Sequence, residues 1–178
     1  MSRWTPGTRA PDTAAMLRVD QAGEYGATRI YAGQLAVLGR GTPASHLVAR
    51  MAAQEERHLK RFNVLMAERR VRPTLLQPLW DVAGFALGAA TALISEKAAM
   101  ACTEAVETEI DKHYADQLAE LGDSDPALVA DITEFKAEEL EHRDTARANG
   151  AADAVGYPLL TAMIRFGCRT AIGLSKRI

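Results

Sequence analysis

Two short stretches, QEERHL at residues 54–59 and EELEH at residues 138–142, decide how this chain is expected to fold. Each contains Glu-x-x-His, which places a carboxylate and an imidazole on adjacent turns of one helix face. Glu24 and Glu107 precede the two motif glutamates by 31 and 32 residues. The order Glu, connection, Glu-x-x-His therefore occurs twice. Two helical hairpins related by an approximate two-fold axis would bring all six side chains around one centre.

The motifs lie on helix faces that are otherwise apolar, because residues three and four apart share a face. Two such faces pass through Met51, Glu55, His58, Phe62 and Leu65, and through Leu128, Ile132, Phe135, Glu139, His142 and Ala146. A third passes through Met100, Thr103, Glu107, Ile110, Tyr114 and Leu121, and a less regular one through Leu17, Glu24, Tyr31, Leu35 and Leu38. The glutamates outside these faces are expected to be solvated: Glu56, Glu68, Glu104, Glu109, Glu120, Glu138 and Glu141.

Four buried carboxylates require compensation, because an unpaired buried ion is strongly destabilising. The four faces carry no lysine or arginine, whereas two divalent cations would balance four carboxylates, with two neutral imidazoles completing the set. This combination of two single glutamates and two Glu-x-x-His motifs is that of ferritin-like di-iron and di-manganese bundles. Oxygen-rich ligation without sulfur suits iron or manganese better than zinc. The predicted metal ligands are Glu24, Glu55, His58, Glu107, Glu139 and His142.

The rest of the sequence favours a helical bundle. The chain has 178 residues and few aromatic residues, and it lacks the β-branched runs of a sheet. We expect an all-α, ferritin-like four-helix bundle with two additional helices and the di-iron site in its core, formed by residues 1–178 as a single domain. Cap and turn signals predict helices over 13–38, 43–70 and 75–94, a fourth ending at 121, a fifth over 126–149 and a sixth that follows Gly150.

Composition excludes several classes of protein. A net charge of −2 gives no overall basic field for nucleic acid. Cys102 and Cys168 are too few and too isolated for a disulfide framework, and we expect them to be small buried residues in a reducing compartment. Residues 1–12 lack the apolar segment of a secretory signal, so secretion is not indicated, although a trimmed organellar form would look the same.

Longer stretches of the chain resemble the demethoxyubiquinone hydroxylase family. These stretches are VDQAGEYGATRIYAGQLAVL (19–38), QEERHL (54–59), ACTEAVETEIDKHYADQL (101–118), EELEHRDTA (138–146) and GCRTAIGLSKRI (167–178). The resemblance covers nearly the whole chain, and DQAGEYGA-x-RIYAGQ is far more specific than the ligand spacing, which ferritins share. The iron ligands of that family fall on the six residues named above.

The resemblance implies a monooxygenase of ubiquinone biosynthesis that uses O₂ to hydroxylate a polyprenylated methoxy-methyl-benzoquinol. It implies two iron ions (Fe²⁺/Fe³⁺) per chain, with NADH as the external reductant, since the sequence has no Gly-rich dinucleotide-binding motif. Two alternatives stay open. One is a ferritin-like protein that oxidises or stores iron. The other is a lipid-binding helical protein whose polar faces only specify packing.

Tyr114 is the candidate catalytic residue. It lies seven residues after Glu107 on the same face, where the family has a tyrosine. Its hydroxyl either hydrogen-bonds a ligand, relays electrons, or is satisfied within an ordinary core. His113 is expected to be solvated or interfacial rather than a ligand. Asp20 and Asp111 lie one turn from the single glutamates of their helices and are candidate outer partners of the ligands.

A hydrophobic substrate suggests a membrane surface. Residues 82–94 are uncharged but too short to span a bilayer, and the acid-free segment from 154 onward predicts a basic amphipathic helix. Both helices either lie on lipid or simply cover the core. We expect a peripheral protein on the cytoplasmic face of a bacterial membrane or, for a trimmed form, on the matrix side of the mitochondrial inner membrane. The polyprenyl quinol and the membrane surface are the expected partners, and nucleic acid is not. A lipid-binding partner protein, a ubiquinone-biosynthesis complex and a homo-oligomer are further expectations.

Overall fold

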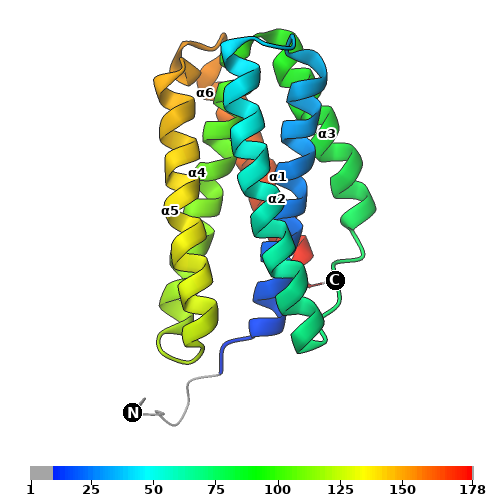
Figure 1. Cartoon of the computed structure of the whole chain (residues 1–178), viewed down its shortest axis with the longest axis vertical. Helices are drawn as coiled ribbons and strands as arrows, with labels where there is room; N and C mark the ends of the chain where they lie inside the picture. The colour runs from blue at the N-terminus through cyan, green and yellow to red at the C-terminus, as the bar shows by residue number, and fades with distance from the viewer. Residues whose placement is uncertain (1–9, 178) are drawn as a thin grey trace.

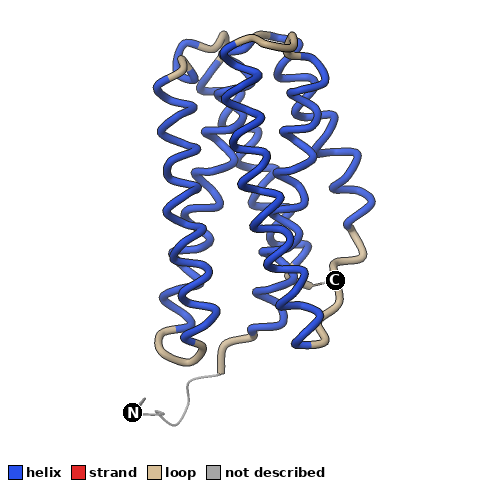
Figure 2. The backbone as a smooth tube through the Cα atoms, in the orientation of Figure 1, coloured by secondary structure: helices blue, strands red, loops and turns tan. Residues whose placement is uncertain are grey.

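The computed structural model describes residues 10–177, and every regular element within that range is helical (Figure 2). The elements are α1 (Thr13–Val37), α2 (Pro43–Arg69), α3 (Gln77–Ile94), α4 (Glu96–Leu121), α5 (Pro126–Ala148), a 3₁₀ turn η1 (Ala151–Asp153) and α6 (Tyr157–Ser175). The hairpins α1–α2 and α4–α5 form the bundle, while α3 packs mainly on α1 and α6 mainly on α4 (Figure 1). The predicted all-α, ferritin-like bundle with two additional helices is confirmed.

Side-chain caps fix where the four bundle helices begin. The caps Asp12, Thr42, Ser95 and Asp125 each accept a hydrogen bond from the amide three residues later, at 3.0–3.2 Å. A cap of this kind contributes about 1 kcal/mol to helix stability. Ser95 also has an extended backbone (φ −176°), so α3 and α4 are separate helices.

The start of the sixth helix differs from the prediction. The sequence predicts a helix directly after Gly150, but η1 intervenes and α6 begins only at Tyr157. Gly156 takes the left-handed conformation (φ 68°), which stops a helix from running through this point. The six residues after Gly150 therefore connect α5 to α6 instead of belonging to α6.

Two apolar clusters fill the bundle on either side of a polar layer. On α2, Met51 belongs to one cluster and Phe62 to the other. Glu55 and His58 lie between them, so each helix is apolar, polar and again apolar along its buried face. This arrangement keeps water away from the polar layer from both ends of the bundle.

The crossing of α1 and α3 is unusually close. A Cβ atom added to Gly33 would lie 2.1 Å from the carbonyl oxygen of Phe85, and one added to Gly88 would lie 1.9 Å from that of Ile30. The helices therefore meet backbone to backbone, which only glycine permits at these positions. This contact holds α3 against the bundle.

Gly33→Ala should push α1 and α3 apart and destabilise the fold by about 1–3 kcal/mol, the usual cost of overpacking. Gly26→Ala is the matched control on the same helix, because a Cβ there meets no atom within 4 Å. Because alanine has a higher helix propensity than glycine, the free energy of unfolding of Gly26→Ala should equal that of the wild type or exceed it by up to about 1 kcal/mol. Urea unfolding of both variants measures the difference, and equal stabilities would contradict the close crossing.

Candidate metal centre

The six predicted ligands lie together at the centre of the bundle, and none is more than 3% exposed. Within residues 10–177, their ligand atoms form two groups, each with its atoms within 4.8 Å of one another. The first group, here called the His58 position, consists of Glu24, Glu55, His58 and Glu139. The second, the His142 position, consists of Glu55, Glu107, Glu139 and His142. Glu55 and Glu139 belong to both groups, as bridging ligands would.

Both imidazoles turn their Nδ1 atoms toward carboxylates. His58 Nδ1 lies 3.1 Å from Glu139 Oε1 and 3.4 Å from Glu24 Oε2. His142 Nδ1 lies 3.1 Å from Glu55 Oε1 and 3.1 Å from Glu139 Oε2. The ring of His58 stacks on Phe135 with centroids 4.1 Å apart, which holds the ring in this orientation.

The carboxylates strongly perturb one another. Burial, reinforced by Glu139, raises the pKa of both Glu55 and Glu107 well above the usual range. Burial opposes ionisation of Glu139 too, but contacts with His142 and His58 lower its pKa to about 2. Burial alone would lower the pKa of His58, whereas contacts with Glu139 and Glu24 raise it to about 10. The centre therefore attracts positive charge, whether from protons or from cations.

A pair of tyrosines crosses the centre. Tyr31 on α1 donates a hydrogen bond to Glu107 Oε1 on α4 at 2.8 Å, and Tyr114 on α4 donates one to Glu24 Oε1 on α1. Each tyrosine follows the glutamate of its own helix by seven residues and binds the glutamate of the other. Only Tyr114 was predicted to be a candidate catalytic residue. Tyr31 occupies the matching position of the internal repeat, seven residues after Glu24.

The outward nitrogen of each imidazole also has a partner. His58 Nε2 lies 2.8 Å from Glu138 Oε2, and His142 Nε2 lies 3.0 Å from Gln54 Oε1. Gln54 and Glu138 occupy matching positions, immediately before their Glu-x-x-His motifs. The prediction that Glu138 is solvated was wrong, because this side chain is only 19% exposed and contacts His58 and Arg57. An acceptor at Nε2 places the proton there and leaves Nδ1 able to bind a metal.

Two other glutamates were also wrongly predicted to be solvated. Glu104 is 5% exposed and accepts hydrogen bonds from Arg147 (2.7 Å) and Tyr157 (2.9 Å). Glu109 is 3% exposed and contacts Arg165 and Arg169 on α6. Glu104 therefore joins the end of α5 and the start of α6 to α4, and Glu109 joins the middle of α6 to α4.

The candidate outer partners Asp20 and Asp111 do not hydrogen-bond the predicted ligands. Asp20 accepts hydrogen bonds from His113 (3.0 Å) and from Gln117 (2.8 Å). Burial outweighs these contacts and raises the pKa of Asp20. Asp111 pairs with Lys136 and Arg143 near the surface.

The donor set fits a pair of divalent cations. Glu55 Oε1, Glu139 Oε1 and His58 Nδ1 are buried without a hydrogen bond of acceptable geometry, and such atoms are normally satisfied in folded proteins. Four carboxylates and two imidazoles, with outer partners that fix both tautomers, match the oxygen-rich, sulfur-free ligation of iron or manganese.

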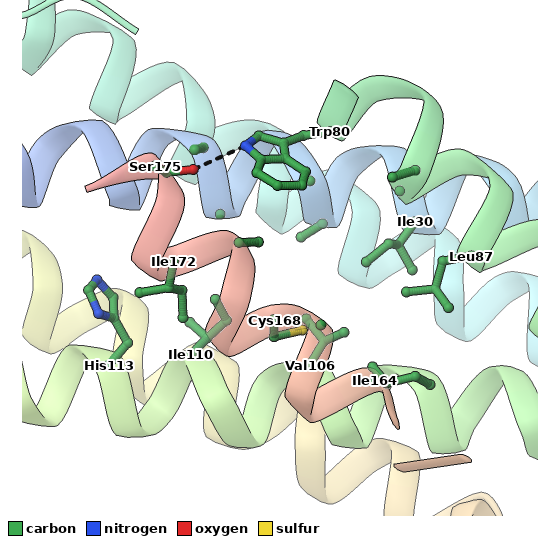
Figure 3. Close-up of a pocket in the computed structure, with 18 of the residues that line it drawn as sticks. Ile30, Trp80, Leu87, Val106, Ile110, His113, Ile164, Cys168, Ile172 and Ser175 are labelled. Carbon is green, nitrogen blue, oxygen red and sulfur yellow. Dashed lines mark hydrogen bonds between the residues drawn. The ribbon is translucent and has the colours of Figure 1, made fainter. Parts of the chain in front are cut away.

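An apolar cavity of about 430 Å³ lies beside the bundle core, and its lining includes Tyr114, which hydrogen-bonds Glu24 of the His58 position. It lies between α3 and α6, with α1 and α4 forming its floor, and Ile30, Leu87, Val106 and Ile110 are among its apolar lining residues (Figure 3). A hydrogen bond from Trp80 Nε1 to Ser175 Oγ, 3.0 Å long, joins α3 to α6 at one end.

Three polar side chains lie together on the wall of the cavity. Asp20, His113 and Tyr114 all line the cavity, and Tyr114 also contacts Glu24 of the metal centre. His113 is thus interfacial, with an 18% exposed side chain. The predicted candidate Tyr114 links the apolar cavity to a candidate ligand.

Known proteins match almost the entire chain. Residues 11–175 match the family described as ubiquinone biosynthesis protein COQ7. The "3-demethoxyubiquinol 3-hydroxylase" of Rhodospirillum rubrum is 57% identical, over 94% of this chain and 81% of the relative. The mouse protein named "NADPH-dependent 3-demethoxyubiquinone 3-hydroxylase, mitochondrial" is 54% identical, over 91% of this chain and 76% of its own length.

A relative from Saccharomyces cerevisiae, "5-demethoxyubiquinone hydroxylase, mitochondrial", is 46% identical over 92% of this chain and 77% of the yeast protein. The similarity therefore extends across bacterial and mitochondrial proteins and covers every helix of the bundle. This chain belongs to the COQ7 family of ubiquinone biosynthesis proteins.

Proposed function

We propose that this protein is a demethoxyubiquinol hydroxylase that binds two iron ions through Glu24, Glu55, His58, Glu107, Glu139 and His142. The observation that carries this proposal is that Tyr114 joins the buried carboxylate centre to an apolar cavity, since it lines the cavity and donates a hydrogen bond to Glu24. Family membership favours hydroxylation over the alternative of iron oxidation or storage. Two bound iron ions would supply the activation of O₂, which amino acid side chains cannot perform.

The cavity would bind the quinol ring and keep water from the reacting atoms. Its wall is almost entirely apolar, which suits a methylated ring that carries a prenyl tail. Asp20 holds the Nε2 proton of His113, so His113 Nδ1 is available to accept a proton from a quinol hydroxyl. Tyr114 would position Glu24 beside the bound ring, since its hydroxyl group donates to that carboxylate.

The reductant would be a nicotinamide nucleotide that acts from outside the bundle. The family resemblance favours NADH, whereas the names of the mouse and human relatives specify NADPH. No residue of the centre discriminates between the two nucleotides.

We further propose that α3 and α6 face the membrane. Large apolar side chains on these helices and their flanking turns are at least 37% exposed: Leu75, Leu79, Val82, Phe85, Leu93, Ile94, Val155, Leu159, Met163, Phe166 and Leu174. The cavity lies between the same two helices, so a prenyl quinol could enter it from lipid. No helix within residues 10–177 combines the length and apolarity needed to cross a bilayer.

The charge of α6 would contribute less to membrane binding than the sequence suggests. Arg165 and Arg169 contact Glu109, whereas Lys176 and Arg177 lie exposed at the end of the helix. Apolar burial would therefore dominate. The same surface fits the cytoplasmic face of a bacterial membrane and the matrix face of the mitochondrial inner membrane. A homo-oligomer, a lipid-binding partner protein and a larger biosynthetic complex stay predictions.

Metal analysis tests the proposed ligands. After anaerobic Fe(II) loading, the wild type should hold two irons per chain, and Glu139→Ala should lose most of both because Glu139 belongs to both positions. Glu141→Ala is the matched control, since Glu141 is exposed on the same helix, and it should keep two. A wild type that stays empty after loading would overturn the proposal.

The two tyrosines provide an internal test of the cavity. Tyr114→Phe and Tyr31→Phe each remove one hydrogen bond to a candidate ligand, but only Tyr114 lines the cavity. We expect similar, modest losses of metal affinity in both variants. Quinol turnover at saturating iron should fall at least about tenfold further in Tyr114→Phe, because only this variant releases a ligand that is held beside the cavity, and small misplacements of reacting groups are costly. Equal turnover in the two variants would refute a role for the cavity.

Vesicle binding tests the membrane face. The wild type should sediment with phosphatidylcholine vesicles, and Phe166→Asp should weaken this binding about tenfold or more, because burying one large apolar side chain contributes about 1.5–3 kcal/mol. Val64→Asp is the control, since Val64 is 42% exposed but lies on α2. Binding that requires anionic lipid and disappears in high salt would contradict a mainly apolar contact.

A further inference from the structure

The two metal positions are nearly identical in their ligands and inner contacts. Each has one imidazole, one glutamate of its own and the shared pair Glu55 and Glu139. Each unshared glutamate accepts a hydrogen bond from one tyrosine, Tyr31 for Glu107 and Tyr114 for Glu24. None of these features would make one position bind a metal ion more tightly than the other.

The acceptors behind the two imidazoles break this symmetry. His58 Nε2 meets the carboxylate of Glu138 at 2.8 Å, whereas His142 Nε2 meets the amide oxygen of Gln54 at 3.0 Å. Gln54 Nε2 points toward Glu138 Oε2 at 3.4 Å, which fixes the amide so that its oxygen faces His142. The four side chains form one hydrogen-bonded chain in the order His58, Glu138, Gln54 and His142, in which one imidazole has a charged acceptor and the other has a neutral acceptor.

Glu138 remains an effective anionic acceptor in this chain. Arg57 pairs with it and favours the ionised carboxylate, but the guanidinium is 49% exposed and is therefore screened by solvent. Asp20, the other acid on the His58 side, is bonded to His113 and Gln117 rather than to an imidazole ligand. Glu138 is thus the charged group that contacts an imidazole ligand directly, at the nitrogen opposite the metal-binding one.

A charged acceptor strengthens an imidazole ligand more than a neutral one. Hydrogen bonds to an ionised acceptor are about twice as strong as neutral ones, and they raise the electron density on the opposite ring nitrogen. Outer partners of this kind change metal affinity by about 10- to 100-fold. We propose that the two metal positions bind with unequal affinity, and that Glu138 makes the His58 position the first to fill.

This inference rests on the proposed metal centre, and the experiment separates the two. Binding of Co(II), an air-stable probe, is followed by calorimetry on the purified full chain. The wild type should show two binding events whose affinities differ by about tenfold or more. A wild type that binds no metal at all would refute the centre itself, whereas two equal events would refute only the inequality.

Variants then assign the tighter event. Glu138→Gln should weaken the first event by about 10- to 100-fold and leave the second nearly unchanged. Glu134→Gln is the matched control: Glu134 also pairs with Arg57 and lies on the same helix, but it is 59% exposed and has no imidazole partner. It should reproduce the wild-type curve.

Single-position variants complete the assignment. His142→Ala should retain the tighter event, and His58→Ala should lose it, with helical content checked by circular dichroism in each case. The proposal is overturned if Glu138→Gln weakens both events equally or neither, if Glu134→Gln has the same effect as Glu138→Gln, or if the tighter event survives in His58→Ala.

Discussion

The structure depends on keeping four glutamates in the middle of a helical bundle. Such a group of carboxylates is unstable unless every oxygen has a donor or a cation. The surrounding side chains meet this demand in layers. Two imidazoles and two tyrosines contact the carboxylates, an amide and a fifth carboxylate hold the imidazoles, and apolar clusters seal both ends. The docking of the two hairpins serves the same demand, because Tyr31 and Tyr114 each donate a hydrogen bond to a glutamate of the other hairpin.

Much of this arrangement could be predicted from local sequence patterns. The starts of α2 and α5 could be predicted because Thr42 and Asp125 are cap residues followed by proline. The six candidate ligands could be predicted because they recur at helical spacing among apolar residues. The wrong predictions for Glu104 and Glu109 share one physical cause. A helix has more than one buried face when extra helices cover it, and the arginines that pair with Glu104 and Glu109 come 43 to 60 residues later. Periodicity within one helix cannot identify a partner at that distance.

The approximate two-fold symmetry also shows where the protein departs from its own repeat. Gln34 and Gln117 follow Tyr31 and Tyr114 by three residues each and play matching parts. Gln117 donates to Asp20 at 2.8 Å, whereas Gln34 donates to Thr103 at 3.4 Å. His113, the other partner of Asp20, lies immediately before Tyr114, where Ile30 precedes Tyr31. The six candidate ligands are thus arranged symmetrically, while the acid and base that line the cavity, Asp20 and His113, occur on one side only.

The crossed hydrogen bonds have a consequence for the order in which the molecule can fold. Tyr31–Glu107, His58–Glu138, His142–Gln54 and Tyr114–Glu24 join residues 76, 80, 88 and 90 positions apart. Each hairpin can form from local contacts, but these four bonds form only when the hairpins dock. Non-local contacts of this kind are slow to form because loop closure costs chain entropy first. The carboxylates therefore gain these partners late in folding, and water must solvate them until the two hairpins dock.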